Sequence, residues 1–513
     1  MRNRTRSMVA GAVGAAVVAA VAGGAMAAAT DGNGRGQGQP SANAAERSQT
    51  TEGDLDGDGH ADLGVGAPEG TVSGKSKAGY VGVTYGAKGG VDTKRHSTLT
   101  QGSAGVPGTP EAKDGFGSTV VRGDVDGDGY ADLVVAANNE AIGSTTQAGS
   151  VTIVFGSASG LSGDAIAFHA PKVAANAHFG DQIAVGDHNK DGLSDLAISD
   201  GVKVQLVKGT KNLRETATPK MTSVTPPGGG VSVEHLASGD INGDGYTDLV
   251  TVASEDSPSD EGTLGVLPGS AEGLKSTPLG KDIPLPFAQY RPVVGDINGD
   301  GKDDVVTDTG FSDGPQEQKL RTYPGTADGL DSDKPVDWKG KVQEGEAIRL
   351  ADFDGDGHDD LVVSNTGAEA PGGYNDAGAV NVLKGTENWL TDEGAQTFSL
   401  DTEGVPGSME GNDKFGTSVS AADYNGDGKT DLAVGIPNRT EGAGAAALLY
   451  AGTDGLSAKD SSLINPSDLG SPATKGRFGT ELTKRRSRPA RWGLSGSSPL
   501  VAWWACCCRH GSG

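Results

Sequence analysis

The chain of 513 residues is poor in cysteine and in aromatic side chains. Its only cysteines are three neighbours, Cys506, Cys507 and Cys508, which form no disulfide framework. Phenylalanine, tryptophan and tyrosine together make up 5% of the residues. Glycine, in contrast, accounts for 84 residues. Tight turns with a positive φ favour glycine over other residues. This composition is typical of many short strands joined by tight turns.

Common catalytic motifs are also missing from the sequence. The eight histidines form no H-E-x-x-H pair, and neither a G-x-S-x-G nucleophile turn nor a G-x-x-x-x-G-K-[ST] phosphate loop occurs. Positive charge is scarce as well, since 42 basic residues face 68 acidic ones, for a formal net charge of −26. A nucleic-acid partner is therefore not expected, because binding to phosphates needs clustered lysine and arginine.

Much of the acidity belongs to one repeated motif, D-x-[DN]-x-D-G-x-x-D-[LV]. The seven copies hold 24 of the 68 acidic residues at their oxygen-bearing positions. Successive copies are separated by 53 to 71 residues, and they begin at Asp54, Asp124, Asp187, Asp240, Asp296, Asp352 and Asp423. Self-similarity at such a period predicts one closed repeat array rather than several unrelated domains.

Each copy is an acidic loop with side-chain oxygens at positions 1, 3, 5 and 9 and a glycine at position 6. Alternating oxygens in a kinked turn suit a hard cation, and Ca²⁺ takes six to eight of them. We assign the residue at position 7 as a backbone-carbonyl ligand and predict about seven structural Ca²⁺ sites. The predicted metal ligands are Asp54, Asp56, Asp58, His60, Asp62, Asp124, Asp126, Asp128, Tyr130, Asp132, Asp187, Asn189, Asp191, Leu193, Asp195, Asp240, Asn242, Asp244, Tyr246, Asp248, Asp296, Asn298, Asp300, Lys302, Asp304, Asp352, Asp354, Asp356, His358, Asp360, Asp423, Asn425, Asp427, Lys429 and Asp431.

Three other interpretations of the acidic loops are less well supported. An EF-hand needs a bidentate glutamate at position 12, which here is valine, isoleucine or threonine in every copy. A glycosidase needs one carboxylate pair with divergent environments, whereas seven equivalent clusters occur. A calcium sensor needs a bistable element, and no such element is evident. We therefore expect Ca²⁺ to neutralise each cluster and to stabilise the fold around it.

Two further elements recur around the acidic loop. Phe-Gly begins eight residues before the loop at Phe116, Phe179 and Phe415, and a Gly-[Ser/Thr]-x-x-Gly-Leu turn follows the loop. The segments between these elements have the composition of short strands, four per repeat. We predict an all-β fold over residues 51–482, a seven-bladed β-propeller of four-stranded antiparallel blades with one calcium loop per blade. An extra Phe-Gly occurs at Phe478, and no acidic loop follows it. Residues 477–482 are therefore expected to complete the first blade and to close the ring.

The N-terminal region has the organisation of an export signal. Arginines precede an apolar run over residues 8–21, and small residues follow at 25–27. We predict a secretory signal peptide at residues 1–29 and a flexible linker at 30–50. The alternative is a membrane anchor, but a run of about 14 residues is short for a span.

The C-terminal region differs sharply from the repeats. Residues 483–513 carry six basic residues, no acidic residue, three of the five tryptophans and all the cysteines. We interpret this segment as unstructured or translated out of frame, with a basic attachment segment as the alternative.

Phe-Gly, the acidic loop and Gly66-Ala67-Pro68 together resemble the FG-GAP repeat of integrin α-subunit propellers, which also occurs in secreted bacterial proteins. The resemblance covers residues 51–482 and implies a seven-bladed propeller with Ca²⁺ in loops on one face. The sequence departs from the family pattern in two ways. Repeats four to six lack Phe-Gly, and Gly-Ala-Pro is intact only once in the whole chain.

The predicted function is a secreted, monomeric module that binds or adheres to an extracellular protein or glycan. The alternatives are an extracellular hydrolase, with its site at the propeller channel or on the face without calcium, and a structural protein associated with the cell wall. After signal cleavage no membrane span is expected. Recognition is expected on the variable loops at residues 140–149, 255–261, 311–318 and 369–376, since binding often uses loops on a rigid scaffold.

Overall fold

The computed structural model describes residues 53–485, apart from 256–260, 289–290, 308–319, 339, 341–346, 370–372, 374 and 473–474. The chain divides into the units Met1–Arg47 and Ser48–Gly513, and all described residues belong to the second. The predicted signal peptide and linker therefore lie outside the described residues, as does most of the C-terminal tail.

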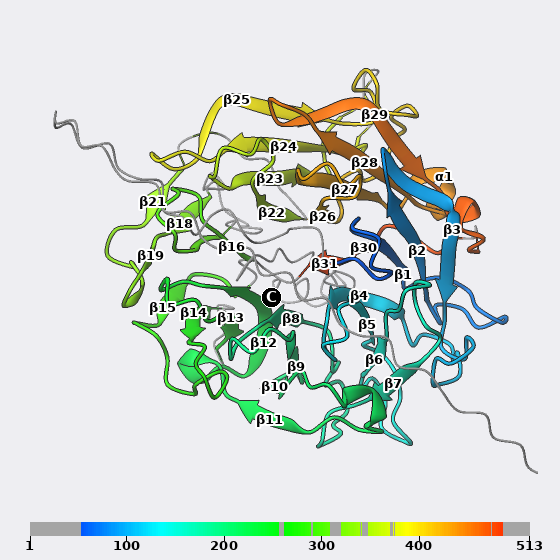
Figure 1. Ribbon diagram of the computed structural model, residues 1–513, viewed down its shortest axis with the longest axis horizontal. Coiled ribbons are helices and arrows are strands. Elements are labelled where there is room, and N and C mark those ends of the chain that lie inside the picture. Colours follow the sequence, from blue (N-terminus) through cyan, green and yellow to red (C-terminus); the bar gives the residue numbers. More distant parts are fainter. Residues whose placement is uncertain are drawn as a thin grey trace, which may run out of the picture. The chain divides into compact units, whose positions relative to one another are not determined.

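The second unit forms seven four-stranded antiparallel sheets, which are arranged as the blades of a ring (Figure 1). Blades one to four comprise β30 (Glu481–Leu482), β1 (Leu63–Ala67), β2 (Tyr80–Ala87) and β3 (Gly90–Leu99); β4 (Phe116–Gly123), β5 (Asp132–Ala137), β6 (Ser150–Val154) and β7 (Ala165–Phe168); β8 (Ile183–Gly186), β9 (Asp195–Ser199), β10 (Val204–Val207) and β11 (Met221–Val224); and β12 (Ser232–Gly239), β13 (Asp248–Ser254), β14 (Gly262–Leu267) and β15 (Ile283–Leu285). Blades five to seven comprise β16 (Pro292–Gly295), β17 (Asp304–Thr307), β18 (Arg321–Tyr323) and β21 (Val336–Asp337); β22 (Ile348–Ala351), β23 (Asp360–Asn365), β24 (Ala379–Lys384) and β25 (Thr391–Phe398); and β26 (Val419–Ala422), β27 (Asp431–Ile436), β28 (Ala445–Ala451) and β29 (Leu456–Ile464). The predicted all-β, seven-bladed propeller is confirmed.

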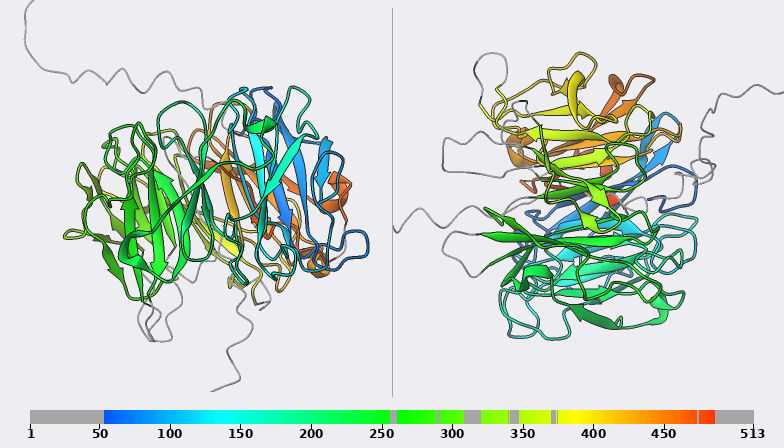
Figure 2. Two further views of the ribbon diagram at one scale, coloured as in Figure 1. Left: turned by 90° about the horizontal axis from the view of Figure 1, so that it is seen from below. Right: turned by 90° about the vertical axis from the view of Figure 1, so that its left-hand side faces the viewer.

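A few short elements complete the described part of the chain. They are a small hairpin, a fifth strand in the second sheet, one α-helix and three 3-10 turns. Their bounds are β19 (Gly325–Thr326), β20 (Gly329–Leu330), β31 (Lys484–Arg485), α1 (Arg439–Gly442), η2 (Leu213–Glu215), η3 (Pro227–Gly229) and η4 (Pro466–Leu469). Within these described residues, no helix has the length and apolarity needed to cross a membrane. Seen from the side, the strands run between the two faces of the ring (Figure 2).

The apolar core lies between neighbouring blades. The second strand of a blade is buried along all or nearly all of its length, as in β5, because both of its faces pack against other blades. The outermost strand β3 instead alternates half-buried and exposed residues between its two buried ends, since one face meets water. Val83 of blade one and Leu133 of blade two share one buried cluster. Stability therefore comes largely from blade-to-blade packing, as in other repeat arrays.

Where a blade has a Phe-Gly dipeptide, this dipeptide joins it to the blade before it. The backbone N–H of Phe116 donates to the carbonyl of Ala78 in blade one at 2.9 Å, and the Phe116 ring is buried. Gly79 must be glycine, because its φ is +84° and a Cβ there would lie 2.2 Å from the Phe116 carbonyl oxygen. The extra Phe478 makes the same bond, to Ala443 of blade seven at 3.1 Å.

The segment after Phe478 reaches blade one and then blade two. Strand β30 pairs antiparallel with β1, with Leu482 opposite Val65. Beyond the predicted propeller boundary at residue 482, β31 pairs in parallel with β4, with Lys484 opposite Val121. This fifth strand was not predicted, because two basic residues have no strand-like pattern.

Candidate metal centres

The structure places each predicted ligand set in a single loop of one blade. In every blade the acidic loop immediately precedes the second strand, and in blades two to seven it directly follows the first. In blade two, for example, Asp124 follows the end of β4 and Asp132 begins β5. The seven loops therefore occupy equivalent positions in seven equivalent sheets.

The aspartate at position 1 organises the loop. In all seven copies its Oδ2 accepts a hydrogen bond from the backbone N–H of the position-6 glycine, at 2.7 to 3.1 Å. Those glycines have φ values between +84° and +94°, a conformation that other residues rarely adopt. This positive φ is the physical reason for glycine at position 6.

The aspartate at position 9 ties the loop to the Gly-rich turn. One of its oxygens accepts from the N–H of the position-2 residue, at 2.7 to 3.3 Å in every blade. The other carboxylate oxygen accepts from the backbone N–H of the first residue of the Gly-rich turn, at 2.8 to 3.0 Å. In blade two the donors to Asp132 are Val125 and Gly156. The acidic loop and the turn thus form one hydrogen-bonded unit.

Burial strongly affects the position-9 carboxyl groups. Desolvation raises the pKa of Asp195, Asp304 and Asp360 to about 7 and the pKa of Asp248 and Asp431 to about 8. For Asp62 and Asp132, burial raises the pKa well above the ordinary value. Without a compensating cation, these groups favour the protonated form near neutral pH.

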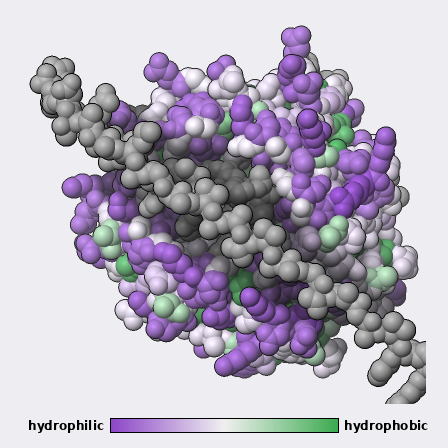
Figure 3. Space-filling model, viewed as in Figure 1, coloured by the Kyte–Doolittle hydropathy of each residue, from purple (hydrophilic) through white to green (hydrophobic). Residues whose placement is uncertain are grey.

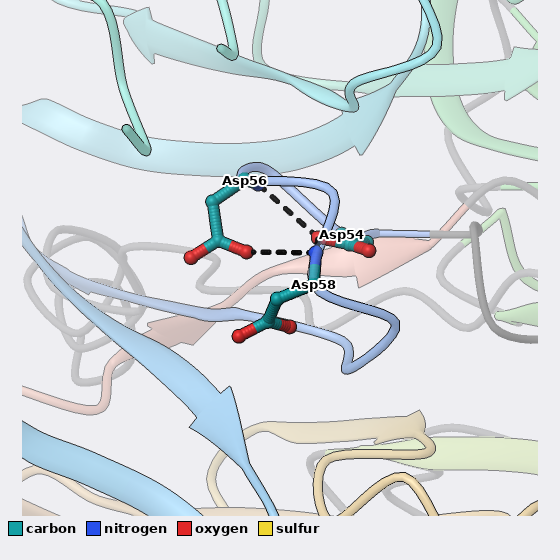
Figure 4. Close-up of side chains that lie close together, drawn as sticks. All are labelled: Asp54, Asp56 and Asp58. Carbon is teal, nitrogen blue, oxygen red and sulfur yellow. Dashed lines mark hydrogen bonds between the residues drawn. The ribbon is translucent and has the colours of Figure 1, made fainter. Parts of the chain in front are cut away.

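Three loops bring three carboxylates together, with one oxygen of each within 4.8 Å of the others. These groups are Asp54, Asp56 and Asp58; Asp124, Asp126 and Asp132; and Asp352, Asp354 and Asp356. Figure 4 shows the first group, in which the N–H of Asp56 donates to Asp54 Oδ1 at 3.2 Å and that of Asp58 to Asp56 Oδ1 at 3.1 Å. The other four loops have asparagine at position 3, so their negative charge is lower.

Asn189 gives an independent test of whether a cation fits. This position-3 residue of the third loop is 7% exposed, and its amide nitrogen donates to Asp195 Oδ2 at 2.9 Å. Its buried Oδ1 has no hydrogen-bond donor among the described residues. A buried amide oxygen beside carboxylates is a suitable ligand for a hard cation, so the donor set fits Ca²⁺.

The position-7 residues take part in the hydrogen bonds of the acidic loop through their backbone N–H groups. In all seven loops the position-7 N–H donates to Oδ1 of the position-5 aspartate, at 2.9 to 3.1 Å. This bond is the same for histidine, tyrosine, leucine and lysine, so the identity of the side chain matters little there. The carbonyl of the same residue, which we assigned as a ligand, remains a prediction.

Neighbouring loops are also bonded to one another. At six of the seven junctions between described loops, the position-8 N–H donates to the position-1 carbonyl of the preceding loop, at 2.8 to 3.3 Å. One of these bonds runs from Ala61 to Asp423 and so joins the first loop to the last. The acidic loops therefore form a nearly continuous hydrogen-bonded belt around the ring.

Basic side chains contact the carboxylates of several loops, a feature that the sequence did not indicate. Two of them stack on an aromatic ring, Arg95 on Tyr85 at 4.5 Å and Arg214 on Phe155 at 4.7 Å. The pairs are Arg95 with Asp56 and Asp58, Arg214 with Asp126 and Asp128, and Lys384 with Asp354 and Asp360. The loops are thus alike in backbone geometry but different in their charged surroundings.

The loops expected to carry recognition are only partly described. Residues 140–149 are complete, and there Glu140 accepts a hydrogen bond from Gln101 at 2.6 Å. Residues 311–318 lie outside the described part, and 255–261 and 369–376 are incomplete. Their predicted role in binding stays a prediction.

Comparison with known families reproduces the repeat. The FG-GAP repeat matches residues 52–83, 116–154, 345–383 and 415–449, and an FG-GAP-like repeat matches 187–251 and 240–307. Mouse phosphatidylinositol-glycan-specific phospholipase D is 33% identical over 109 residues, which is 21% of this chain and 12% of that protein. Integrin alpha-5 of Xenopus laevis is 43% identical over 86 residues, 17% of this chain and 8% of the integrin. The chain thus spans only about a tenth of the length of these relatives.

Among solved structures, the crystal structure of BBS1N in complex with ARL6DN is similar over 68% of this chain and 81% of that one. The identity is 13% and the TM-score 0.37.

Proposed function

Because this chain belongs to the FG-GAP repeat family, we propose that it is a secreted, calcium-stabilised propeller that acts as a binding or adhesion module for an extracellular glycan or protein. The observation that carries the proposal is the sevenfold recurrence of one loop geometry. In every blade the position-9 aspartate makes the same two backbone bonds, for example to Val125 and Gly156 in blade two. Seven equivalent clusters support a role in holding the scaffold rather than in one reaction.

In this scaffold role, about seven Ca²⁺ ions would occupy the acidic loops. Side-chain oxygens at positions 1, 3, 5 and 9 would hold the ion, which supplies positive charge to carboxylates that otherwise repel. The pairing of β30 with β1 would close the ring, because it connects the last blade's Phe478 segment to the first blade. Extracellular Ca²⁺ is near millimolar, in keeping with weak sites of this kind.

The surface favours a polar ligand. Among the described residues, Val202 and Val231 are the exposed large hydrophobic side chains. The coloured part of the face in Figure 3 is mostly hydrophilic, with scattered hydrophobic residues. A surface without a broad apolar patch suits a glycan or a polar protein surface better than an obligate hydrophobic interface.

The second candidate is an extracellular hydrolase with its site at the propeller channel or on the face away from the acidic loops. The phospholipase D activity in the mouse relative's name favours it, although the match covers 12% of that protein. The full chain, produced with Ca²⁺, should be tested on glycan and extracellular-protein arrays and in a broad hydrolase screen. Saturable binding without turnover supports the proposal. Robust turnover that a channel-facing substitution abolishes overturns it in favour of the hydrolase.

A further inference from the structure

A pocket of about 420 Å³ lies between blades five and six. Blade five contributes Asp337 of β21 and the following Trp338, and blade six contributes Asn388 and Trp389 from the turn between β24 and β25. Small-molecule sites commonly have volumes of about 300–1,000 Å³. These are the only two of the chain's five tryptophans that lie in the described part of the chain.

Trp389 occupies a backbone position that suits glycine. Its φ is +76°, and in the equivalent turns of blades two, four and five the residue is Gly160, Gly273 and Gly329, with φ from +93° to +106°. The turns are otherwise the same. Thr386 Oγ1 donates to the Trp389 carbonyl at 2.7 Å, as Ser157, Ser270 and Thr326 donate to the glycines at 2.6 to 2.7 Å.

The tryptophan is therefore not there to form the turn. A non-glycine residue in the left-handed region costs about 1–2 kcal/mol of conformational free energy. The equivalent turns of blades two, four and five avoid that cost by having glycine. Blade six instead has a strained aromatic residue at the edge of a pocket. Strain of this kind, found where the scaffold offers an unstrained alternative, points to a function of the side chain.

Both tryptophan rings are held in place from behind. Trp338 and Trp389 pack against the apolar cluster that contains Leu320 and Ile348. The backbone N–H of Trp338 donates to the Leu320 carbonyl at 3.0 Å, and a Cβ at Gly340 would lie 2.1 Å from the Trp338 ring. The rings thus bury one part against the core and present another part to the pocket.

Polar groups surround the two rings. Asp337 is oriented by Arg321, whose Nε and Nη2 lie 2.6 and 2.9 Å from its two carboxylate oxygens. Asn388 and Asp392 are exposed on the other side of the pocket. Fixed aromatic faces with hydrogen-bonding groups at the rim match the chemistry of a pyranose ring, which has apolar C–H faces and a belt of hydroxyls.

We infer that this pocket binds a neutral pyranose unit of an extracellular glycan, with Trp338 and Trp389 as the stacking residues. Asp337 and Asp392 would accept hydrogen bonds from sugar hydroxyls, and Asn388 could donate or accept one. Arg321 compensates the charge of Asp337, and the remaining negative charge of Asp392 disfavours an anionic sugar, because like charges repel. This inference rests on the proposed binding function and narrows its ligand to a glycan.

The test uses the full chain with Ca²⁺ and an array of cello-, manno-, galacto- and chito-oligosaccharides, with oligogalacturonate as the anionic comparison. The best neutral probe is then titrated by calorimetry and by tryptophan fluorescence. Trp389→Gly introduces the residue that the equivalent turns of blades two, four and five have. The fold is therefore expected to survive, which thermal melting can verify. The variant should weaken binding by about tenfold or more and remove most of the fluorescence change. Trp338→Ala should act in the same direction.

Asn388→Ala and Asn212→Ala form a matched pair, since Asn212 is an exposed asparagine in the corresponding turn of blade three. Only Asn388→Ala should weaken binding of the neutral probe. Undiminished glycan binding by the folded Trp389→Gly protein would overturn the pocket assignment and leave the binding function intact. Binding of a protein but of no glycan would also overturn it. Turnover without any binding partner would instead overturn the proposed function itself.

Discussion

Arg214 of blade three places its Nε atom 2.8 Å from Oδ2 of Asp126, in the acidic loop of blade two. Its Nη2 atom lies 2.7 Å from Oδ2 of Asp128, and the guanidinium stacks on Phe155. A side-chain cation from the next blade therefore partly compensates two of the predicted Ca²⁺ ligands. It is a local substitute for metal charge and also a link between two blades.

We expect Arg214→Ala to lower the stability of the protein more in EDTA than in excess Ca²⁺. Without metal, Asp126 and Asp128 lose their compensating cation, at a cost of about 1–3 kcal/mol for a partly buried charged bond. With Ca²⁺ bound, the ion supplies the missing charge. Thermal melting of the variant in both buffers measures the difference, with the exposed neighbour substitution Lys211→Ala as the control. An equal loss in both buffers would show that Arg214 acts through packing alone.

Removal of Ca²⁺ should lower the melting temperature of the wild-type protein substantially at neutral pH. A ligand that binds only the folded state stabilises it by about 2.7 kcal/mol per site at 100 times its Kd. Several loops acting together should therefore give a large shift. Melting curves with EDTA, and again after Ca²⁺ is restored in excess, provide the measurement. A curve that chelation leaves unchanged contradicts the calcium assignment.

The position-9 carboxyl groups predict opposite pH behaviour with and without metal. Burial raises the pKa of Asp248 and Asp431 to about 8 in the folded chain, from an ordinary value of 3.8. The folded state thus binds more protons than the unfolded state between these values, and metal-free stability should fall as the pH rises through that window. Ca²⁺ binds the ionised carboxylates, so its stabilising effect should grow with pH.

Melting temperatures at about pH 5 and about pH 8, each with EDTA and with excess Ca²⁺, test this linkage. The gap between the two buffers should be wider at the higher pH. A metal-free melting temperature that rises between the two pH values would contradict the expected proton uptake. Asp431→Asn removes one titrating carboxyl and should reduce the slope without abolishing it.

Asp132 and Asp128 belong to the same loop but should differ in their effect on folding. Asp132 is fully buried and accepts from Val125 and Gly156, so Asp132→Ala leaves two buried N–H groups without a partner. We expect a loss of about 2–5 kcal/mol in the free energy of unfolding. Asp128 is about one-third exposed, and Asp128→Ala should weaken one metal site while the ring stays folded. Denaturant unfolding in Ca²⁺ compares the two, and equal losses would contradict the structural role of position 9.

The repeat motif predicted the fold because its residues act within one blade. Asp124 and Gly129 bond to each other across five positions, so their spacing in the sequence carries the geometry. Contacts between blades have no such local signature. Arg214 lies 88 residues from Asp126, and neither residue type nor spacing connects them. Trp389 was not singled out from the sequence, because its positive φ and its pocket are evident only in the structure.

Phe478 provides the test of whether the chain's ends hold the ring together. Its ring is buried and stacks with Tyr80 of blade one at 6.4 Å between centroids, while its N–H bonds to Ala443 of blade seven. Phe478→Ala should cost about 3–5 kcal/mol, as for other buried phenylalanines.

The matched control is Phe116→Ala, because Phe116 makes the equivalent contact between two blades that are adjacent in the chain. Both variants lose the same ring, but only Phe478→Ala weakens the junction between blades one and seven, where strand β30 is held on β1 by strand pairing alone. Limited proteolysis in Ca²⁺ should therefore cut the Phe478→Ala protein near blades one and seven, and the Phe116→Ala protein should resist cleavage there. Identical cleavage patterns would mean that the hydrogen bond from Ala61 to Asp423 keeps the first and last blades together without the aromatic contact.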